Sequence, residues 1–182
     1  MFFYKKYVII YMIKKRKEMS VMNILFLDYD GVVNVPIWDP LAREFEMNMP
    51  HHGAVNHRDA VQWVEAFCQI YNFQIVVISD WRLNNNWRQC LVNGGLTDSS
   101  LILDRTIHLP PTAANYGRGH EIQMWLDEHP EVENFLILDD DVSEMLPQHA
   151  RHTIQPDPEV GFCEWLHCQA VDKFYEGELK NE

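Results

Sequence analysis

The chain has 182 residues, of which 47% are hydrophobic and 23% are charged. This length and composition predict one globular domain with its own core, and they exclude a disordered or low-complexity chain. The 27 acidic residues outnumber the 15 lysines and arginines and give a net charge of -12. So acidic a chain disfavours general binding to the phosphate backbone of nucleic acids.

The N-terminal segment differs in charge from the rest of the chain. Six of the 15 basic residues lie in the first 18 positions, and the net charge from Met19 onward is -17. Residues 1–21 fit either a basic, apolar extension that touches a membrane or an upstream translation start. The apolar run 7–13 is too short to span a bilayer, and no signal-peptide cleavage site follows it. We therefore expect no stable membrane insertion, a dispensable extension over 1–21 and a domain over 22–182, with Met19 or Met22 as a natural start.

Cysteine usage indicates the redox environment. The four cysteines are Cys68, Cys90, Cys163 and Cys168. Without an export signal they predict reduced thiols in a cytoplasmic protein. Cys163 and Cys168, with His167 between them, could belong to a metal cluster. However, Cys163, Leu166 and Ala170 recur at helical spacing, and a zinc site needs four well-spaced ligands, so we favour a helix.

Short apolar runs alternate with amphipathic segments along the chain. Strands buried on both faces are predicted over 23–27, 74–78, 101–103 and 135–138, with a weaker fifth over 152–155. Helices are predicted over 59–71, with Asn56 as N-cap, and over 83–92, 119–129 and about 159–175. Strands that alternate with helices pair in parallel through right-handed crossovers. The sequence predicts a three-layer α/β sandwich with its site at the C-terminal edge of the sheet.

Polar side chains follow three of the predicted strands directly. The first strand ends in DYDG at 28–31, the second in SDWR at 79–82 and the fourth in DDD at 139–141. Carboxylates crowded at one edge raise one another's pKa unless a hard cation lies among them, and oxygen ligands of this kind suit Mg²⁺. A carboxylate held on Mg²⁺ can attack phosphorus, and a second one two residues later can serve as acid and base.

These segments resemble the motifs of the haloacid dehalogenase (HAD) superfamily. ILFLDYDGVVN resembles motif I, VVIS resembles motif II and FLILDDD resembles motif IV. Motif III, a basic residue at the start of a helix, is best matched by Arg118 in RGHEIQMWL, with His120 and Arg105 as alternatives. With SDWR and the late HTIQPDPEVGF, the chain is similar to the HAD-type domain of Swiss Army Knife RNA repair proteins. The motifs cover residues 23–141.

The resemblance implies a HAD-like, Rossmannoid sheet and a Mg²⁺-dependent phosphatase. Asp28 would be the nucleophile that forms an aspartyl-phosphate, and Asp30 the acid and base. Ser79 and Arg118 would hold the phosphoryl oxygens of a phosphorylated substrate. Arg82 is a further candidate for substrate binding.

The same resemblance implies a metal site. Its ligands would be the Asp28 carboxylate, the backbone carbonyl of Asp30 and the Asp140 carboxylate. Asp139 would support Asp140, and the roles of these two neighbours could be exchanged.

Each motif also has a structural interpretation. Asp-x-Asp-Gly alone is often a turn or a calcium loop, and an acidic run such as 139–141 alone is usually a solvated helix start. Arg82 alone would be a surface charge. Trp81 is interpreted as a packing residue, with stacking on substrate as the alternative. The ordered set favours function over these separate explanations.

Two other functions compete with a phosphatase. A non-catalytic module of the same fold could bind a phosphorylated partner or nucleic acid, but the presence of both Asp28 and Asp30 argues against a degenerate site. A receiver-like signalling domain also uses acidic Mg²⁺ residues. It would need the phosphorylated aspartate after a later strand, and this chain has a different order.

The family often inserts a cap domain after motif I or between motifs II and III. The segments 35–56 and 82–117 leave no room for a full cap, so we expect an open site that suits large substrates such as proteins or nucleic-acid ends. A basic path for a polynucleotide would have to be built from Arg82, Arg88, Arg105, Arg118 and Arg151. The net charge argues against that path, and the sequence leaves the phosphate ester unidentified.

Overall fold

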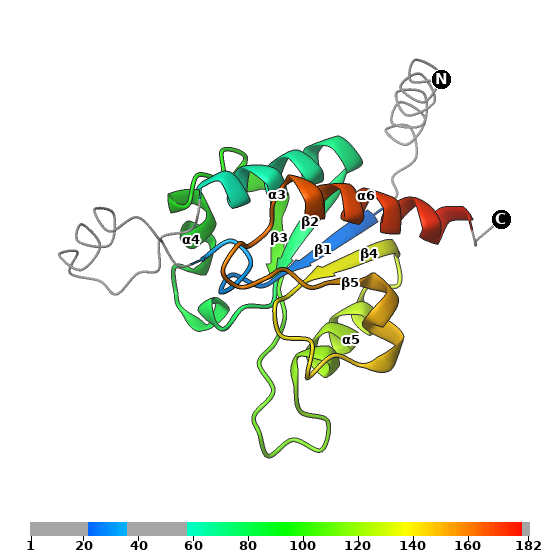
Figure 1. The fold of residues 1–182 in the computed structure, drawn as a ribbon. Coiled ribbons are helices and arrows are strands. Elements are labelled where there is room, and N and C mark those ends of the chain that lie inside the picture. Colours follow the sequence, from blue (N-terminus) through cyan, green and yellow to red (C-terminus); the bar gives the residue numbers. More distant parts are fainter. Residues whose placement is uncertain (1–21, 36–57, 180–182) are drawn as a thin grey trace.

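A five-stranded parallel sheet forms the centre of the computed structural model, which describes residues 22–35 and 58–179 (Figure 1). The strands are β1 (Met22–Leu27), β2 (Phe73–Val77), β3 (Ile102–Arg105), β4 (Val132–Leu138) and β5 (Thr153–Ile154). Their order is β3-β2-β1-β4-β5, and every neighbouring pair is parallel. The predicted parallel α/β fold is confirmed, including the weak fifth strand.

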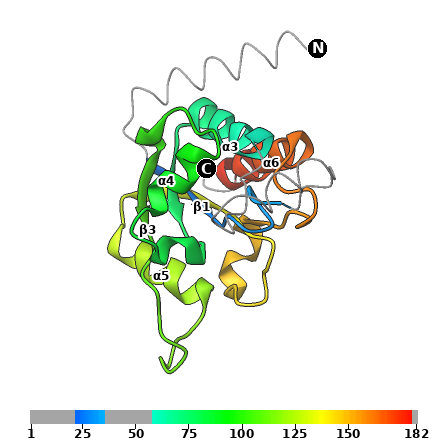
Figure 2. The same cartoon turned by 90° about the vertical axis from the view of Figure 1, so that its left-hand side faces the viewer.

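Helices cover both faces of this sheet. The α-helices are α3 (Arg58–Tyr71), α4 (Trp87–Asn93), α5 (Arg118–Glu128) and α6 (Glu164–Leu179). The described residues also form three short 3₁₀ helices, η1 (Asp80–Leu83), η2 (Ser99–Leu101) and η3 (Pro147–His152). Helices α3 and α6 lie on one face and α5 lies on the other (Figures 1 and 2). The result is the predicted three-layer sandwich.

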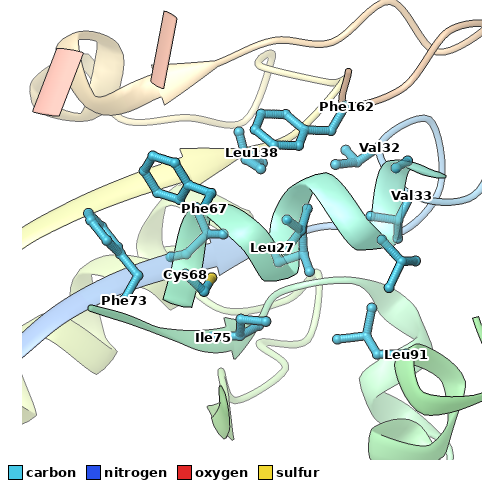
Figure 3. Packing of buried hydrophobic residues seen from close by; sticks show 14 of the residues in the cluster. Leu27, Val32, Val33, Phe67, Cys68, Phe73, Ile75, Leu91, Leu138 and Phe162 are labelled. Atoms are coloured by element: carbon cyan, nitrogen blue, oxygen red, sulfur yellow. The ribbon is translucent and has the colours of Figure 1, made fainter. Parts of the chain in front are cut away.

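Two apolar clusters hold the layers together, one on each face of the sheet. In the larger, Phe67 of α3 packs with Leu27 of β1 (Figure 3). In the smaller, Phe26 of β1 meets Trp125 of α5 edge-to-face, with ring centroids 5.5 Å apart. Successive residues of a strand point to opposite faces, so a central strand covered on both sides must be apolar throughout. This explains the continuous apolar run at 24–27.

The bounds of two helices differ from the prediction. The helix expected over 83–92 begins only at Trp87, because η1 ends first and Asn84 is extended with ψ 146°. The last helix begins at Glu164 rather than near 159. Gly161 there adopts φ +71°, and the backbone N–H of Phe162 donates to the carbonyl of Val32 at 2.7 Å. This turn ties the segment to the loop after β1 before the helix can start.

The remaining expectations about the fold concern the cysteines, the membrane and the cap. All four cysteines are free thiols in the structure. Within 22–35 and 58–179, no helix has the length and apolar character needed to cross a bilayer. The connection 106–117 between β3 and α5 contains no helix or strand, so no cap domain is inserted there. The N-terminal extension, Asn56 and segment 36–57 lie outside the described residues.

Candidate active site

The sheet topology brings the ends of β1, β2 and β4 together. Strand β1 is central, and Leu27 pairs with Leu138 of β4 on one side and with Val77 of β2 on the other. The next residues, Asp28 and Asp139, are therefore neighbours. The chain first proceeds from β1 to β2 and β3, and then crosses to β4 on the other side of β1. Such a switch of direction opens a crevice at the carboxyl ends of the strands.

Three carboxylates converge at this point. Asp28, Asp139 and Asp140 each place one carboxylate oxygen within 4.8 Å of the other two. Among the described residues, this is the one group of three or more side chains close enough to hold a metal ion together. Asp28 is 4% exposed and Asp139 is fully buried. Asp28 continues the alternation that places Ile24 and Phe26 on the α5 side of β1. The acidic cluster, as we call these three residues, therefore lies on the side of the sheet from which α5 can reach it.

Arg118, the first residue of α5, reaches this acidic cluster. Its Nη1 lies 2.8 Å from Asp139 Oδ2 and 3.3 Å from Asp28 Oδ1. Burial lowers the pKa of Arg118, but the two carboxylates outweigh burial and raise it, so the guanidinium stays charged. Of the residues considered for motif III, Arg105 instead donates to the carbonyl of Arg82. The best sequence match is thus the arginine that contacts the cluster.

Burial makes the negative charge of these carboxylates costly. It raises the pKa of Asp28 to about 7; Arg118 opposes this shift and Asp139 adds to it. Burial also raises the pKa of Asp139 and of Asp140, although Arg118 again opposes it in both. One guanidinium thus leaves the three carboxylates under-compensated. A hard divalent cation with oxygen ligands fits this donor set.

Ser79 and Gly31 complete the surroundings of the cluster. Ser79 is buried, and its side chain hydrogen-bonds to Asp28, which lowers the pKa of that carboxyl. Gly31 adopts φ +69°, and a Cβ there would lie 2.4 Å from Cγ of Asp140. Only glycine allows both this turn and this close approach. The turn of the Asp-x-Asp-Gly segment therefore packs directly against the side chain of Asp140, which follows β4.

Asp30 lies beside the acidic cluster and outside it. Its Oδ2 accepts a hydrogen bond of 2.9 Å from Trp81 Nε1, and its Oδ1 accepts one from the Asn34 side chain. Unlike Asp28, Asp30 is exposed to solvent. The predicted role of its backbone carbonyl as a metal ligand stays a prediction.

Arg82 is buried rather than displayed on the surface. Its side chain is 2% exposed, and Nη2 lies 2.6 Å from Oε2 of Glu121, which is itself buried. The guanidinium also donates to the carbonyl of Ile78 and to Asp80, the latter at 3.2 Å. The interpretation of Arg82 as a surface charge is wrong, because these partners take up its charge internally. Its predicted role in substrate binding stays a prediction.

A cleft of about 180 Å³ opens beside Arg118. Its lining includes the acidic and basic side chains of Asp80, Arg82, Arg118, Glu121, Asp141 and Glu144 and the imidazole of His108. The half-exposed Tyr116 adds an aromatic wall. Arg118 thus faces both the acidic cluster and an open space where a substrate could lie.

Two acidic residues that shape this site were missed by the sequence analysis. Glu121 binds Arg82 and also accepts a 2.8 Å hydrogen bond from the backbone N–H of Leu109. Glu144 accepts a 3.0 Å hydrogen bond from the backbone N–H of Arg118 at the start of α5. The one signal available was the position of Glu121 in the first turn of a predicted helix, where acidic side chains are common for other reasons. Glu121 lies within the segment quoted for motif III but was given no role, and Glu144 belongs to no motif.

Comparison with protein families agrees with this architecture. A family described as "HAD domain in Swiss Army Knife RNA repair proteins" matches residues 24–165. No curated protein and no solved structure gave a match. The matched segment runs from β1 into the first turn of α6 and includes every strand end that contributes to the site. The chain therefore belongs to the family of HAD domains found in Swiss Army Knife RNA repair proteins.

Proposed function

We propose that this protein is a Mg²⁺-dependent phosphatase that hydrolyses a phosphomonoester through an aspartyl-phosphate on Asp28. The observation that carries the proposal is the contact of one arginine, Arg118, with both Asp28 and Asp139, next to Asp140 and an open cleft. This arrangement offers a nucleophile, a fixed positive charge for the phosphoryl group and ligands for a cation in one place. Family membership supports the same type of hydrolase.

Asp28 and Asp140 are the residues that would hold Mg²⁺, together with the backbone carbonyl of Asp30. Bound there, Mg²⁺ would supply positive charge that shields the attacking carboxylate and stabilises the phosphoryl oxygens. Asp139 suits the supporting role, because it is fully buried and bound to Arg118 and to the backbone N–H of Asp141 at 3.0 Å. Asp140 is less buried and lies against Gly31, on the motif I side of the cluster.

In the first step, a carboxylate oxygen of Asp28 attacks phosphorus. The bond from phosphorus to the ester oxygen breaks, and its electron pair leaves with that oxygen. Arg118 and the Ser79 hydroxyl lie beside Asp28, where they can donate to the phosphoryl oxygens as their charge rearranges. Asp30, protonated at this moment, gives its proton to the departing oxygen.

In the second step, Asp30 acts as the base. It takes a proton from water, the water oxygen attacks phosphorus, and the bond to Asp28 breaks. Inorganic phosphate and the original carboxylate are the products. The two carboxylates thus divide one difficult hydrolysis into two displacements.

The substrate is proposed only by class. An open site without a cap in the connection 106–117 suits a large phosphorylated molecule, such as a nucleic-acid end. The charge of the chain argues against tight binding of a polyanion. The matched family is named for RNA repair proteins, so phosphorylated oligonucleotides belong in any panel of substrates.

A phosphatase screen tests this proposal. The panel contains nucleotides, sugar phosphates, phosphopeptides and oligonucleotides with a 3′- or 5′-phosphate, each with Mg²⁺ and with EDTA. We expect Mg²⁺-dependent release of phosphate in the parent and none in Asp28→Asn. An Asp28→Asn protein, free of contaminating phosphatases, that keeps substantial Mg²⁺-dependent activity would remove the mechanism.

A further inference from the structure

The Asp30 carboxylate is bound on both of its oxygens by neutral donors. Trp81 Nε1 donates to Oδ2 at 2.9 Å, and the Asn34 side chain donates to Oδ1. Asn34 is four residues away in the same turn, whereas Trp81 comes from a different strand end, 51 positions along the chain. An exposed aspartate in a loop would ordinarily adopt several rotamers. Here a tertiary contact selects one of them.

Trp81 is held more firmly than the carboxylate that it contacts. It is the second residue of η1, and its indole is partly buried and packs against the larger apolar cluster. Its backbone N–H donates to Oγ of Ser79 at 3.4 Å, and its carbonyl accepts from Asn84 at 3.1 Å. The next residue, Arg82, is fixed by its buried pair with Glu121. The indole therefore positions Asp30, and not the reverse.

We propose that Trp81 is the residue that positions Asp30 for proton transfer, an inference that rests on the proposed phosphatase function. Each carboxyl oxygen has two lone pairs, so a donor on one of them leaves the other for the transferred proton. The indole N–H can therefore hold the Asp30 carboxyl group in both steps. In the first step this carboxyl group gives its proton to the departing ester oxygen, and in the second step it takes a proton from water. A proton donor must be aimed within hydrogen-bond reach of its target. Trp81 supplies that aim through the carboxyl group of Asp30 and needs no contact with the substrate.

This role predicts a loss of rate that depends on the leaving group. Trp81→Phe keeps an aromatic ring for packing and removes the N–H. For an alkyl phosphate, whose alkoxide departs poorly without a proton, we expect kcat to fall roughly 10-fold, in line with the sensitivity of rate to small misplacements. For 4-nitrophenyl phosphate, whose leaving group needs no proton, only the second step depends on Asp30, so we expect a clearly smaller fall. KM should be unchanged for both esters.

The ratio of the two kcat values is the decisive readout, because loss of folded protein lowers both rates equally. Trp165→Phe is the matched control: Trp165 is 67% exposed in the first turn of α6, and this variant should keep the parent ratio. A double-mutant cycle then separates positioning from direct contact with substrate. If Trp81 acts through Asp30, adding Trp81→Phe to Asp30→Asn should lower the alkyl phosphate rate no further.

Three outcomes would overturn the inference. If the parent shows no Mg²⁺-dependent phosphatase activity, the proposed function fails and this inference fails with it. If Asp30→Asn loses activity selectively on the alkyl ester while Trp81→Phe keeps the parent ratio, the function stands and only the role of Trp81 is wrong. If Trp81→Phe raises KM and lowers both rates additively with Asp30→Asn, Trp81 binds substrate instead.

Discussion

Replacing Asp28 by asparagine should stabilise the folded protein at about pH 8 when divalent cations are absent. Folding raises the pKa of Asp28 from 3.8 to about 7, chiefly through burial. The folded state therefore binds this proton more tightly than the unfolded chain does. The free energy of unfolding of the parent therefore falls as the pH rises from about 4 to about 7. Asparagine resembles the neutral acid in shape and avoids this loss.

The size of the effect follows from the shift. Each pKa unit corresponds to about 1.4 kcal/mol, so a move from 3.8 to about 7 amounts to about 4 kcal/mol at about pH 8. For a chain of this size, 1 kcal/mol changes the melting temperature by roughly 2–4 °C. We therefore expect Asp28→Asn to melt on the order of 10 °C above the parent in EDTA. The difference should vanish at about pH 3 and below, where the acid is largely neutral in both states.

Thermal unfolding across this pH range measures the effect directly. Asp172→Asn, which changes an exposed aspartate on α6, is the matched control and should follow the parent at every pH. Mg²⁺ should then raise the melting temperature of the parent more than that of Asp28→Asn, because a ligand of the folded state stabilises it by mass action. If Asp28→Asn melts at or below the parent at about pH 8 in EDTA, Arg118 compensates the charge fully and the argument fails.

Three further substitutions test separate parts of the site. Asp140→Ala should lose the stabilisation by Mg²⁺ that the parent shows in thermal melts; equal stabilisation would exclude Asp140 as a ligand. Gly31→Ala places a Cβ 2.4 Å from Asp140 Cγ in a backbone conformation that alanine disfavours, so urea unfolding should show a loss of about 1–3 kcal/mol. Glu121→Gln leaves Arg82 without its buried anionic partner and should cost about 3–5 kcal/mol in the same assay. The exposed Glu128→Gln on the same helix should cost almost nothing, and a similar loss in both variants would contradict the buried-pair argument.

The fold and the acidic cluster could be predicted because both follow from local patterns. Asp28 and Asp139 directly follow apolar runs, and a parallel sheet brings the carboxyl ends of its strands to one edge. The register of β1 with β4 then makes these two residues neighbours. The shared edge could be predicted without knowledge of distant contacts, whereas the strand order that places β4 beside β1 comes from the structure.

Element boundaries and long-range side-chain contacts could not be predicted in this way. The start of α6 depends on a backbone hydrogen bond between Phe162 and Val32, and this contact has no sequence signature. Trp81 was interpreted as a packing residue, which its ring confirms, but its N–H reaches Asp30 only after β1 and β2 have paired. A side chain with an apolar body and a polar edge can do both at once.

Arg82 and Arg118 show why residue type and strand-end position alone do not assign a role. Arg82 follows β2, and Arg118 begins α5 beside the same edge of the sheet. Both arginines pair with buried carboxylates. Arg82 is 2% exposed and its main partner, Glu121, lies in the first turn of α5, so the pair clamps η1 to the helix that carries Arg118. Arg118 is 20% exposed and shares its charge between Asp28 and Asp139 while its remaining surface faces the cleft. A guanidinium with spare exposure can exchange a partner for a phosphoryl group, whereas one that is enclosed would leave a buried glutamate unpaired if it moved. We therefore expect Arg118 to meet the substrate and the Arg82–Glu121 pair to hold η1 against α5, while the contact of Arg82 with substrate at the cleft it lines stays a prediction.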